Sequence, residues 1–138
     1  INGKIIGFGG RVLGDAKPKY VNTKDTEIFD KGRNLFGLNI ARHSRRRGVI
    51  LCEGYMDVIS QHQAALIKRY TSEVYLAYDS DGAGINAAKR AIGILRNVGL
   101  SQRIIDLKPY KDPDEFLKNL GAEAYEERIK NAITGRIL

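Results

Sequence analysis

Runs of hydrophobic residues in the first third of the chain are short and are repeatedly interrupted by glycine. This pattern predicts strands and turns rather than long helices, because paired glycines favour a bend or bulge and proline favours a turn. The expected elements are a strand over 4–13, a turn over 15–19, a short strand over 20–22, mixed helix and loop over 26–42, and a polar linker over 45–48. We therefore expect a small N-terminal β/α subdomain.

From Val49 onward, short apolar runs alternate with amphipathic segments. The expected elements are strands over 49–52, 73–78 and 103–107, and helices over 55–70, 85–98, 114–120 and 123–133. The helix over 85–98 has the clearest pattern, because its apolar residues recur on one face and Gly99 follows its end. Strands that alternate with helices predict an α/β fold with an open, mainly parallel sheet flanked by helices.

Composition supports a folded protein without a membrane span. The chain has 138 residues, of which 43% are hydrophobic, so a core is affordable and the size fits one domain or a domain plus a subdomain. No apolar run reaches the roughly 18 residues that a membrane helix needs. The single cysteine, Cys52, cannot form an internal disulfide, which favours a reducing cytoplasm, and it is expected to be a small buried hydrophobic residue. Two scattered histidines and one cysteine argue against zinc.

Positive charge is concentrated in the first part of the chain. Lys and Arg total 23 against 16 Asp and Glu, a net charge of +7, which indicates a polyanionic partner. Up to Arg47 there are 11 basic and 4 acidic residues, whereas the remainder is nearly balanced and carries the acidic clusters. A basic half and an acid-bearing half are the combination expected of a polyanion track beside a metal site.

Acidic residues follow each of the three predicted parallel strands. Glu53 follows the first strand, Asp79 and Asp81 follow the second, and Asp112 and Asp114 follow the third after a short loop. Ligands of open α/β sheets bind at the carboxyl ends of the strands, so these carboxylates should converge. Their mutual repulsion would be relieved by a hard divalent ion, Mg²⁺ or Mn²⁺. Two such ions can clamp the attacking and leaving oxygens of a phosphoryl displacement.

Each of these acidic motifs also has a purely structural interpretation. The segment 79–82 could be a strand-to-helix loop with a helix cap, although Gly82 and Gly84 would let the backbone turn sharply toward a ligand. Asp112 could cap a helix that has Pro113 in its first turn, with a glutamate three residues beyond the cap reaching back. Asp57 fits a first-turn acid favoured by the helix dipole. The coincidence of acids at three strand ends favours metal binding.

Two other chemistries fit part of the pattern. The segment 82–87 matches a dinucleotide-binding fingerprint with Asp106 at the end of the next strand, but Asp79 and Asp81 would then face a pyrophosphate without a metal. A phosphatase-like interpretation uses the first aspartate of Asp-x-Asp-Gly as a covalent nucleophile. It leaves Glu53 and the basic N-terminal half unexplained.

The ordered set of motifs resembles that of the bacterial DnaG-type primases. The segments 53–57, 77–84 and 111–114 look like their Toprim motifs, and the segments 6–13, 18–22, 29–32 and 35–38 resemble the region just upstream. The resemblance covers nearly the whole chain. It implies a basic N-terminal subdomain of the polymerase core at 1–47, a Toprim domain at 48–110, and an acidic motif with helices that complete the Toprim domain at 111–138.

The resemblance also implies an activity and its site residues. The expected activity is Mg²⁺- or Mn²⁺-dependent synthesis of RNA primers from ribonucleoside triphosphates on single-stranded DNA during replication. The implied metal-binding and catalytic acids are Glu53, which is also a candidate general acid or base, Asp79, Asp81, Asp112 and Asp114, with Asp57, Gly82 and Gly84 in support. The implied phosphate contacts are Arg11, Lys19 and Lys31. Asn22 is a candidate for positioning the nucleotide, with a turn cap as the alternative.

The sequence departs from the primase pattern in two ways. Primases usually have a further strand and a small-residue loop before the Asp-x-Asp strand, and that segment is missing here near Ala64 and Ala65. The chain also lacks the zinc-binding domain, the first part of the polymerase core and the region that binds the replicative helicase, so we expect little or no priming by it alone. A non-catalytic nucleotide- or polyanion-binding module and an NAD-type dinucleotide-binding domain remain as alternatives.

Overall fold

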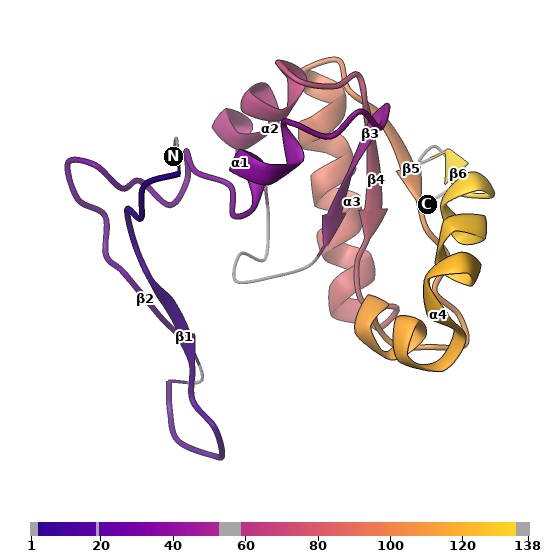
Figure 1. Ribbon diagram of the computed structural model, residues 1–138, viewed down its shortest axis with the longest axis horizontal. Helices are drawn as coiled ribbons and strands as arrows, with labels where there is room; N and C mark the ends of the chain where they lie inside the picture. The colour runs from indigo at the N-terminus through magenta and orange to yellow at the C-terminus, as the bar shows by residue number, and fades with distance from the viewer. Residues whose placement is uncertain (1–2, 19, 53–58, 135–138) are drawn as a thin grey trace. The chain divides into compact units, whose positions relative to one another are not determined.

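The structure is a computed structural model that describes residues 3–18, 20–52 and 59–134. The chain divides into two compact units, Ile1–Ser44 and Arg45–Leu138 (Figure 1). The candidate phosphate-binding residues fall in the first unit and the candidate metal ligands in the second.

The N-terminal unit is built around one β-hairpin. β1 (Gly9–Arg11) pairs antiparallel with β2 (Tyr20–Asn22), and α1 (Leu38–Ala41) is a single short helical turn. The hairpin extends by one more step, because the Thr23 amide donates to the Phe8 carbonyl at 2.9 Å. The strand expected over 4–13 is therefore much shorter in the structure. No described residue of this unit is buried.

The second unit contains a four-stranded sheet. Its strands are β3 (Gly48–Cys52), β4 (Glu73–Ala77), β5 (Ser101–Ile104) and β6 (Ile133–Thr134), in the order β3-β4-β5-β6. The first three are parallel and β6 is antiparallel to β5, which confirms the mainly parallel α/β sheet. β6 was not predicted, because the last expected helix ran to residue 133, whereas α4 ends at Lys130.

Three helices accompany the sheet. They are α2 (Gln61–Lys68), α3 (Gly82–Asn97) and α4 (Pro113–Lys130), and Figure 1 shows α3 and α4 on opposite sides of the sheet. The expected break in the last helix is present, because Gly121 has a φ of 77° and divides α4 into two helical pieces. None of the helices in the described part of the chain combines the length and apolar character that a membrane crossing requires.

The core of this unit lies on both faces of β4. Side chains alternate across a strand, so Val74 and Leu76 face one way and Ala77 faces the other, and all three are buried. Ala77 joins the cluster around Phe116 of α4. β3 is the edge strand, and Ile50 is 39% exposed there. Cys52 is exposed rather than buried as expected, and among the described residues its strand pairs only with β4.

Candidate functional site

Two loops that carry candidate metal ligands are joined at the carboxyl ends of β4 and β5. Ser80, in the loop after β4, donates its amide N–H to the carbonyl oxygen of Lys111 at 2.8 Å. Its hydroxyl lies 3.0 Å from the carbonyl oxygen of Tyr110 and 3.1 Å from that of Lys111. The bonds connect the segment that carries Asp79 to the segment that carries Asp112. The structure thus brings these two acids to the same edge of the sheet.

Asp81 lies at the N-terminus of α3 and caps it. Its Oδ1 accepts a hydrogen bond from the Gly84 amide at 2.8 Å, and its own backbone is extended. A Cβ at Gly84 would clash with the carbonyl oxygen of Asp79, so glycine is needed for this close approach. At Gly82 a Cβ would meet open space. Packing within this loop therefore requires glycine at position 84 and leaves room for a side chain at position 82.

Asp112 caps α4 in much the way that the sequence suggests. Its Oδ1 accepts from the Glu115 amide at 2.8 Å, and Pro113 stands in the first turn. Glu115 reaches back, but its Oε2 accepts from the Lys111 amide at 2.8 Å rather than from the capping residue. A carboxylate can accept about four hydrogen bonds, so capping does not exclude a metal at Asp112.

Asp114 points to solvent and already has a cationic partner. Its Oδ2 lies 2.6 Å from the Nζ of Lys118 one helical turn later, and both side chains are largely exposed. The hydrogen bond to Asp114 raises the pKa of Lys118. Asp114 would have to exchange Lys118 for an ion to serve as a ligand. Lys118 was not considered in the sequence analysis, although an acid four residues before a lysine on a helix is a readable signal.

Asp79 lies in an unfavourable electrostatic environment for a carboxylate. Burial raises its pKa, the negative charge of Asp112 raises it further, and Asp81 adds to the rise, whereas Lys111 opposes it. The three aspartates are therefore close enough to interact. A bound cation would relieve the repulsion that they share.

The described acids form only part of the expected donor set. Within 3–18, 20–52 and 59–134, no group of three Asp, Glu, His or Cys side chains is arranged to hold a metal ion. Glu53 and Asp57, which the sequence analysis placed at the metals, lie outside the described residues. The interaction of Asp79 with Asp112 and Asp81 is therefore the observation from which a metal site can be argued.

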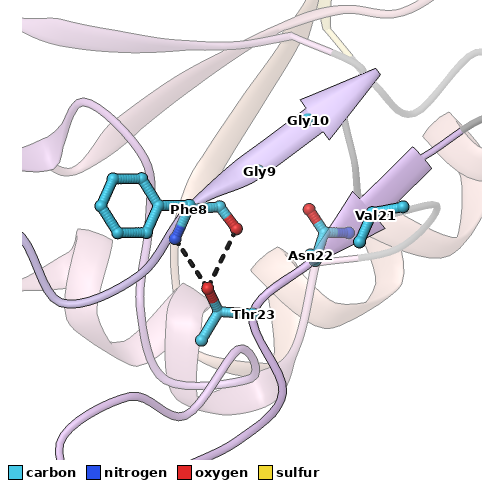
Figure 2. A pocket seen from close by; sticks show the side chains of 6 residues that line it. All are labelled: Phe8, Gly9, Gly10, Val21, Asn22 and Thr23. Carbon is cyan, nitrogen blue, oxygen red and sulfur yellow. Dashed lines mark hydrogen bonds between the residues drawn. The ribbon is translucent and has the colours of Figure 1, made fainter. Parts of the chain in front are cut away.

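The β1–β2 hairpin carries the candidate nucleic-acid residues of the first unit. Strand alternation places Gly9 and Arg11 on one face with their partners Asn22 and Tyr20. The Arg11 guanidinium lies 5.4 Å from the centre of the Tyr20 ring, a cation–π distance. Figure 2 shows the Asn22 side chain beside the bare backbone of β1. The hollow drawn there, of about 360 Å³, is lined by Phe8, Gly9, Gly10, Val21, Asn22 and Thr23.

The structure says less about the two candidate lysines than about Arg11. Lys19 lies outside the described residues. Lys31 follows the hairpin, and its amide donates to Asp25 Oδ1 at 2.9 Å, which fixes the backbone of that loop. Tyr20 was not singled out from the sequence, and it is the neighbour of Arg11 on the hairpin.

Both units match known families. Residues 1–42 match the family described as the N-terminal domain of the DNA primase catalytic core, and residues 60–117 match the Toprim-like family. A protein named DNA primase from Clostridium acetobutylicum is 45% identical, over 96% of this chain and 25% of its own length. The alignment runs over 151 residues, more than the 138 of this chain, so the relative carries positions that this chain lacks.

Solved structures agree with these matches. The crystal structure of the Aquifex aeolicus primase, with its zinc-binding and RNA polymerase domains, superposes with a TM-score of 0.88 at 36% identity, over 96% of this chain and 38% of that one. The structure of a DnaG primase catalytic domain bound to single-stranded DNA superposes with a TM-score of 0.76 at 34% identity, over 96% of this chain and 50% of that one. These matches do not favour a dinucleotide-binding domain. Asp81 also occupies the helix N-terminus that a pyrophosphate would need.

Proposed function

This chain belongs to the DnaG-type bacterial DNA primases, and we propose that it contributes to metal-dependent synthesis of RNA primers on single-stranded DNA. It spans about a quarter of the length of the Clostridium relative. Nucleotidyl transfer from ribonucleoside triphosphates, the template, the RNA primer and an interaction with the replicative helicase through a region outside this chain are parts of the proposal. Its role in replication would place the protein in the cytoplasm.

The observation that carries the proposal is the junction of the two acidic loops at Ser80. The junction sets Asp79 and Asp112 at one sheet edge, and the two charges interact strongly enough for Asp112 to raise the pKa of Asp79. Closely spaced carboxylates are a favourable arrangement for a hard cation. The edge is also the end of the parallel strands at which α/β proteins bind ligands.

Oxygen donors of this kind suit Mg²⁺ or Mn²⁺ better than zinc, which more often takes nitrogen and sulfur ligands. Asp79, Asp81 and Asp112 do not form a complete ligand group among the described residues, so they would hold the ions together with Glu53, and Asp114 would join after release from Lys118. Bound ions of this type activate a hydroxyl nucleophile and stabilise a leaving pyrophosphate. Glu53 is also the proposed general acid or base, and Asp57 a nearby acid.

The N-terminal unit is proposed to bind phosphates of the template or the incoming nucleotide. Arg11 is exposed on the hairpin and stacks on Tyr20, so its guanidinium is presented on a defined face. Lys19 and Lys31 are the other proposed phosphate contacts, and Asn22 is proposed to position the nucleotide. Fixed cations of this kind give affinity that depends on salt and little on sequence.

Titration with Mn²⁺ tests the metal site directly. Electron paramagnetic resonance measures free Mn²⁺ as it is added to the chain and to its Asp79→Asn and Asp112→Asn variants. Each variant should bind Mn²⁺ roughly tenfold more weakly or worse, because a charged oxygen donor is lost. Asp106→Asn is the matched control, because Asp106 is exposed and its carboxylate accepts only a local bond from the Lys108 amide among those described.

The result separates the proposed enzyme core from a polyanion-binding module. If Asp79→Asn and Asp106→Asn bind Mn²⁺ as the unmodified chain does, the metal site is wrong. Binding of single-stranded DNA by all three proteins would then favour the module. Primer synthesis by the chain alone should be low or absent, since it spans a minor part of its relatives.

A further inference from the structure

Ser80 stands between two candidate ligands and bonds to the loop that carries a third. Its amide and hydroxyl contact the carbonyls of Tyr110 and Lys111, 30 and 31 residues later in the chain. The hydroxyl lies within hydrogen-bond distance of both carbonyls, so its single proton can be shared or can alternate between them. Ser80 itself is half-buried; its hydroxyl bond to Tyr110 is partly buried, whereas the one to Lys111 is exposed.

The loop that receives these bonds is otherwise anchored to α4. The Tyr110 ring packs edge-on against Phe116, with 5.5 Å between ring centres, and the Lys111 amide donates to Glu115. Phe116 is fully buried, so this end of the loop moves with the helix and its core. The bonds from Ser80 attach the same loop to the end of β4. They therefore tie α4 and its cap Asp112 to the strand that leads to Asp79.

We propose that Ser80 is a positioning residue whose hydroxyl sets the spacing between Asp79 and Asp112, and through that spacing the affinity of the site for a divalent ion. The inference rests on the proposed metal-binding function. Ser80 is not itself proposed as a ligand. Loss of the hydroxyl leaves the amide bond to Lys111, so the loops stay attached with a looser spacing.

Three substitutions at this position test the hydroxyl. Ser80→Ala removes it, Ser80→Cys replaces it with a thiol of similar size that donates weakly, and Ser80→Thr keeps it. We expect Mn²⁺ affinity to fall about three- to tenfold in Ser80→Ala, the range that one lost hydrogen bond can produce, and to fall in Ser80→Cys. Ser80→Thr should bind as the unmodified chain does. Ser101→Ala is the control, because Ser101 begins β5 at the opposite end of the sheet.

The readouts distinguish positioning from general destabilisation. Binding of single-stranded DNA without metal should be unchanged in all of these variants, and thermal unfolding monitors the fold. If Ser80→Ala does not fold, the role of the hydroxyl is tested by comparing the Mn²⁺ affinity of Ser80→Cys with that of Ser80→Thr. Equal Mn²⁺ affinity for the chain and the folded Ala or Cys variants, with Asp79→Asn still weak, would overturn the role of Ser80 alone. Unchanged binding in Asp79→Asn would instead overturn the metal site.

Discussion

The two units of this protein differ in how their apolar side chains are covered. In the second unit the buried core runs from α2 through β4 and α3 to α4, and Phe116 has no exposed surface. In the first unit no described residue is buried, and Phe36 is fully exposed. The second unit is therefore stabilised by packing, whereas the first is held by hydrogen bonds across the hairpin, such as those between Phe8 and Thr23.

The two units also differ in the charged residues that they carry. The second unit, which has the packed core, holds the acids of the proposed metal site, and such a site would require their spacing to be controlled within a few tenths of an ångström. The first unit carries most of the excess positive charge, which acts over longer distances and needs less exact placement. The comparison suggests that packing has been concentrated where geometry matters most for the proposed function.

The core of the second unit should depend strongly on Phe116. Phe116→Ala removes a ring that contacts both Tyr110 and Tyr125, and should lower the free energy of unfolding by about 3–5 kcal/mol. Phe36→Ala, the matched truncation in the first unit, should change it by less than about 0.5 kcal/mol. Urea unfolding followed by circular dichroism measures both. A comparable loss in Phe36→Ala would show that the first unit has a core.

A smaller effect concerns close packing at the acidic loop. Gly84→Ala places a methyl group against the Asp79 carbonyl and should cost about 1–3 kcal/mol, with weaker Mn²⁺ binding as the loop shifts. Gly93→Ala lies in the same helix with open space around it, so it should stabilise the protein by up to about 1 kcal/mol. Thermal unfolding compares them. If both substitutions raise the melting temperature equally, Gly84 has room for a side chain.

The raised pKa of Asp79 predicts that the stability of the fold depends on pH with a definite sign. The pKa of Asp79 is raised in the folded state, chiefly by burial and then by Asp112. The folded state therefore holds this proton more tightly, and the contribution of Asp79 to stability is lost as pH rises through the folded pKa. Asp79→Asn should raise the melting temperature at pH 7 relative to the unmodified chain, and the gain should vanish below the unfolded pKa, near pH 3.8.

Divalent metal should reverse that difference. Mn²⁺ should raise the melting temperature of the unmodified chain more than that of Asp79→Asn, because the ion binds the folded state through this carboxylate. Differential scanning calorimetry across pH 3 to 7, with and without metal, measures both effects. A destabilised Asp79→Asn at pH 7 without metal would show that Asp79 has a favourable partner that outweighs the repulsion.

Sequence patterns predicted the second unit better than the first. The period of the segment 85–98 identified α3, and the two helices expected over 114–120 and 123–133 located the break at Gly121 in α4, because both signals are local. The position of β3 at the sheet edge, with exposed Cys52, could not be read from its apolar run, since periodicity does not encode strand order. β6 was missed because two residues after a helix carry too little pattern.

The candidate site was predicted from the sequence only in part. Strand-end acids indicated the edge at which Asp79 and Asp112 meet, because chain topology brings parallel strand ends together. Ser80 was missed because its partners are some 30 residues away, and no local pattern reports such bonds. The assignments of Glu53, Asp57 and Lys19 remain predictions, since they lie outside the described residues.

Arg11, on the hairpin of the first unit, should contribute a small and salt-dependent part of the affinity for single-stranded DNA. Arg11→Ala should weaken binding of single-stranded DNA by a few-fold and should reduce the slope of log affinity against log salt by about 0.7, the value for one phosphate contact on a single strand. Arg33→Ala is the control in the same unit, because Arg33 already pairs with Asp30 at 3.5 Å. Fluorescence anisotropy of a labelled oligonucleotide over a range of salt concentrations measures both. An equal change in slope for the two variants would mean that DNA responds to the net charge of the unit and not to the face that Arg11 and Tyr20 present.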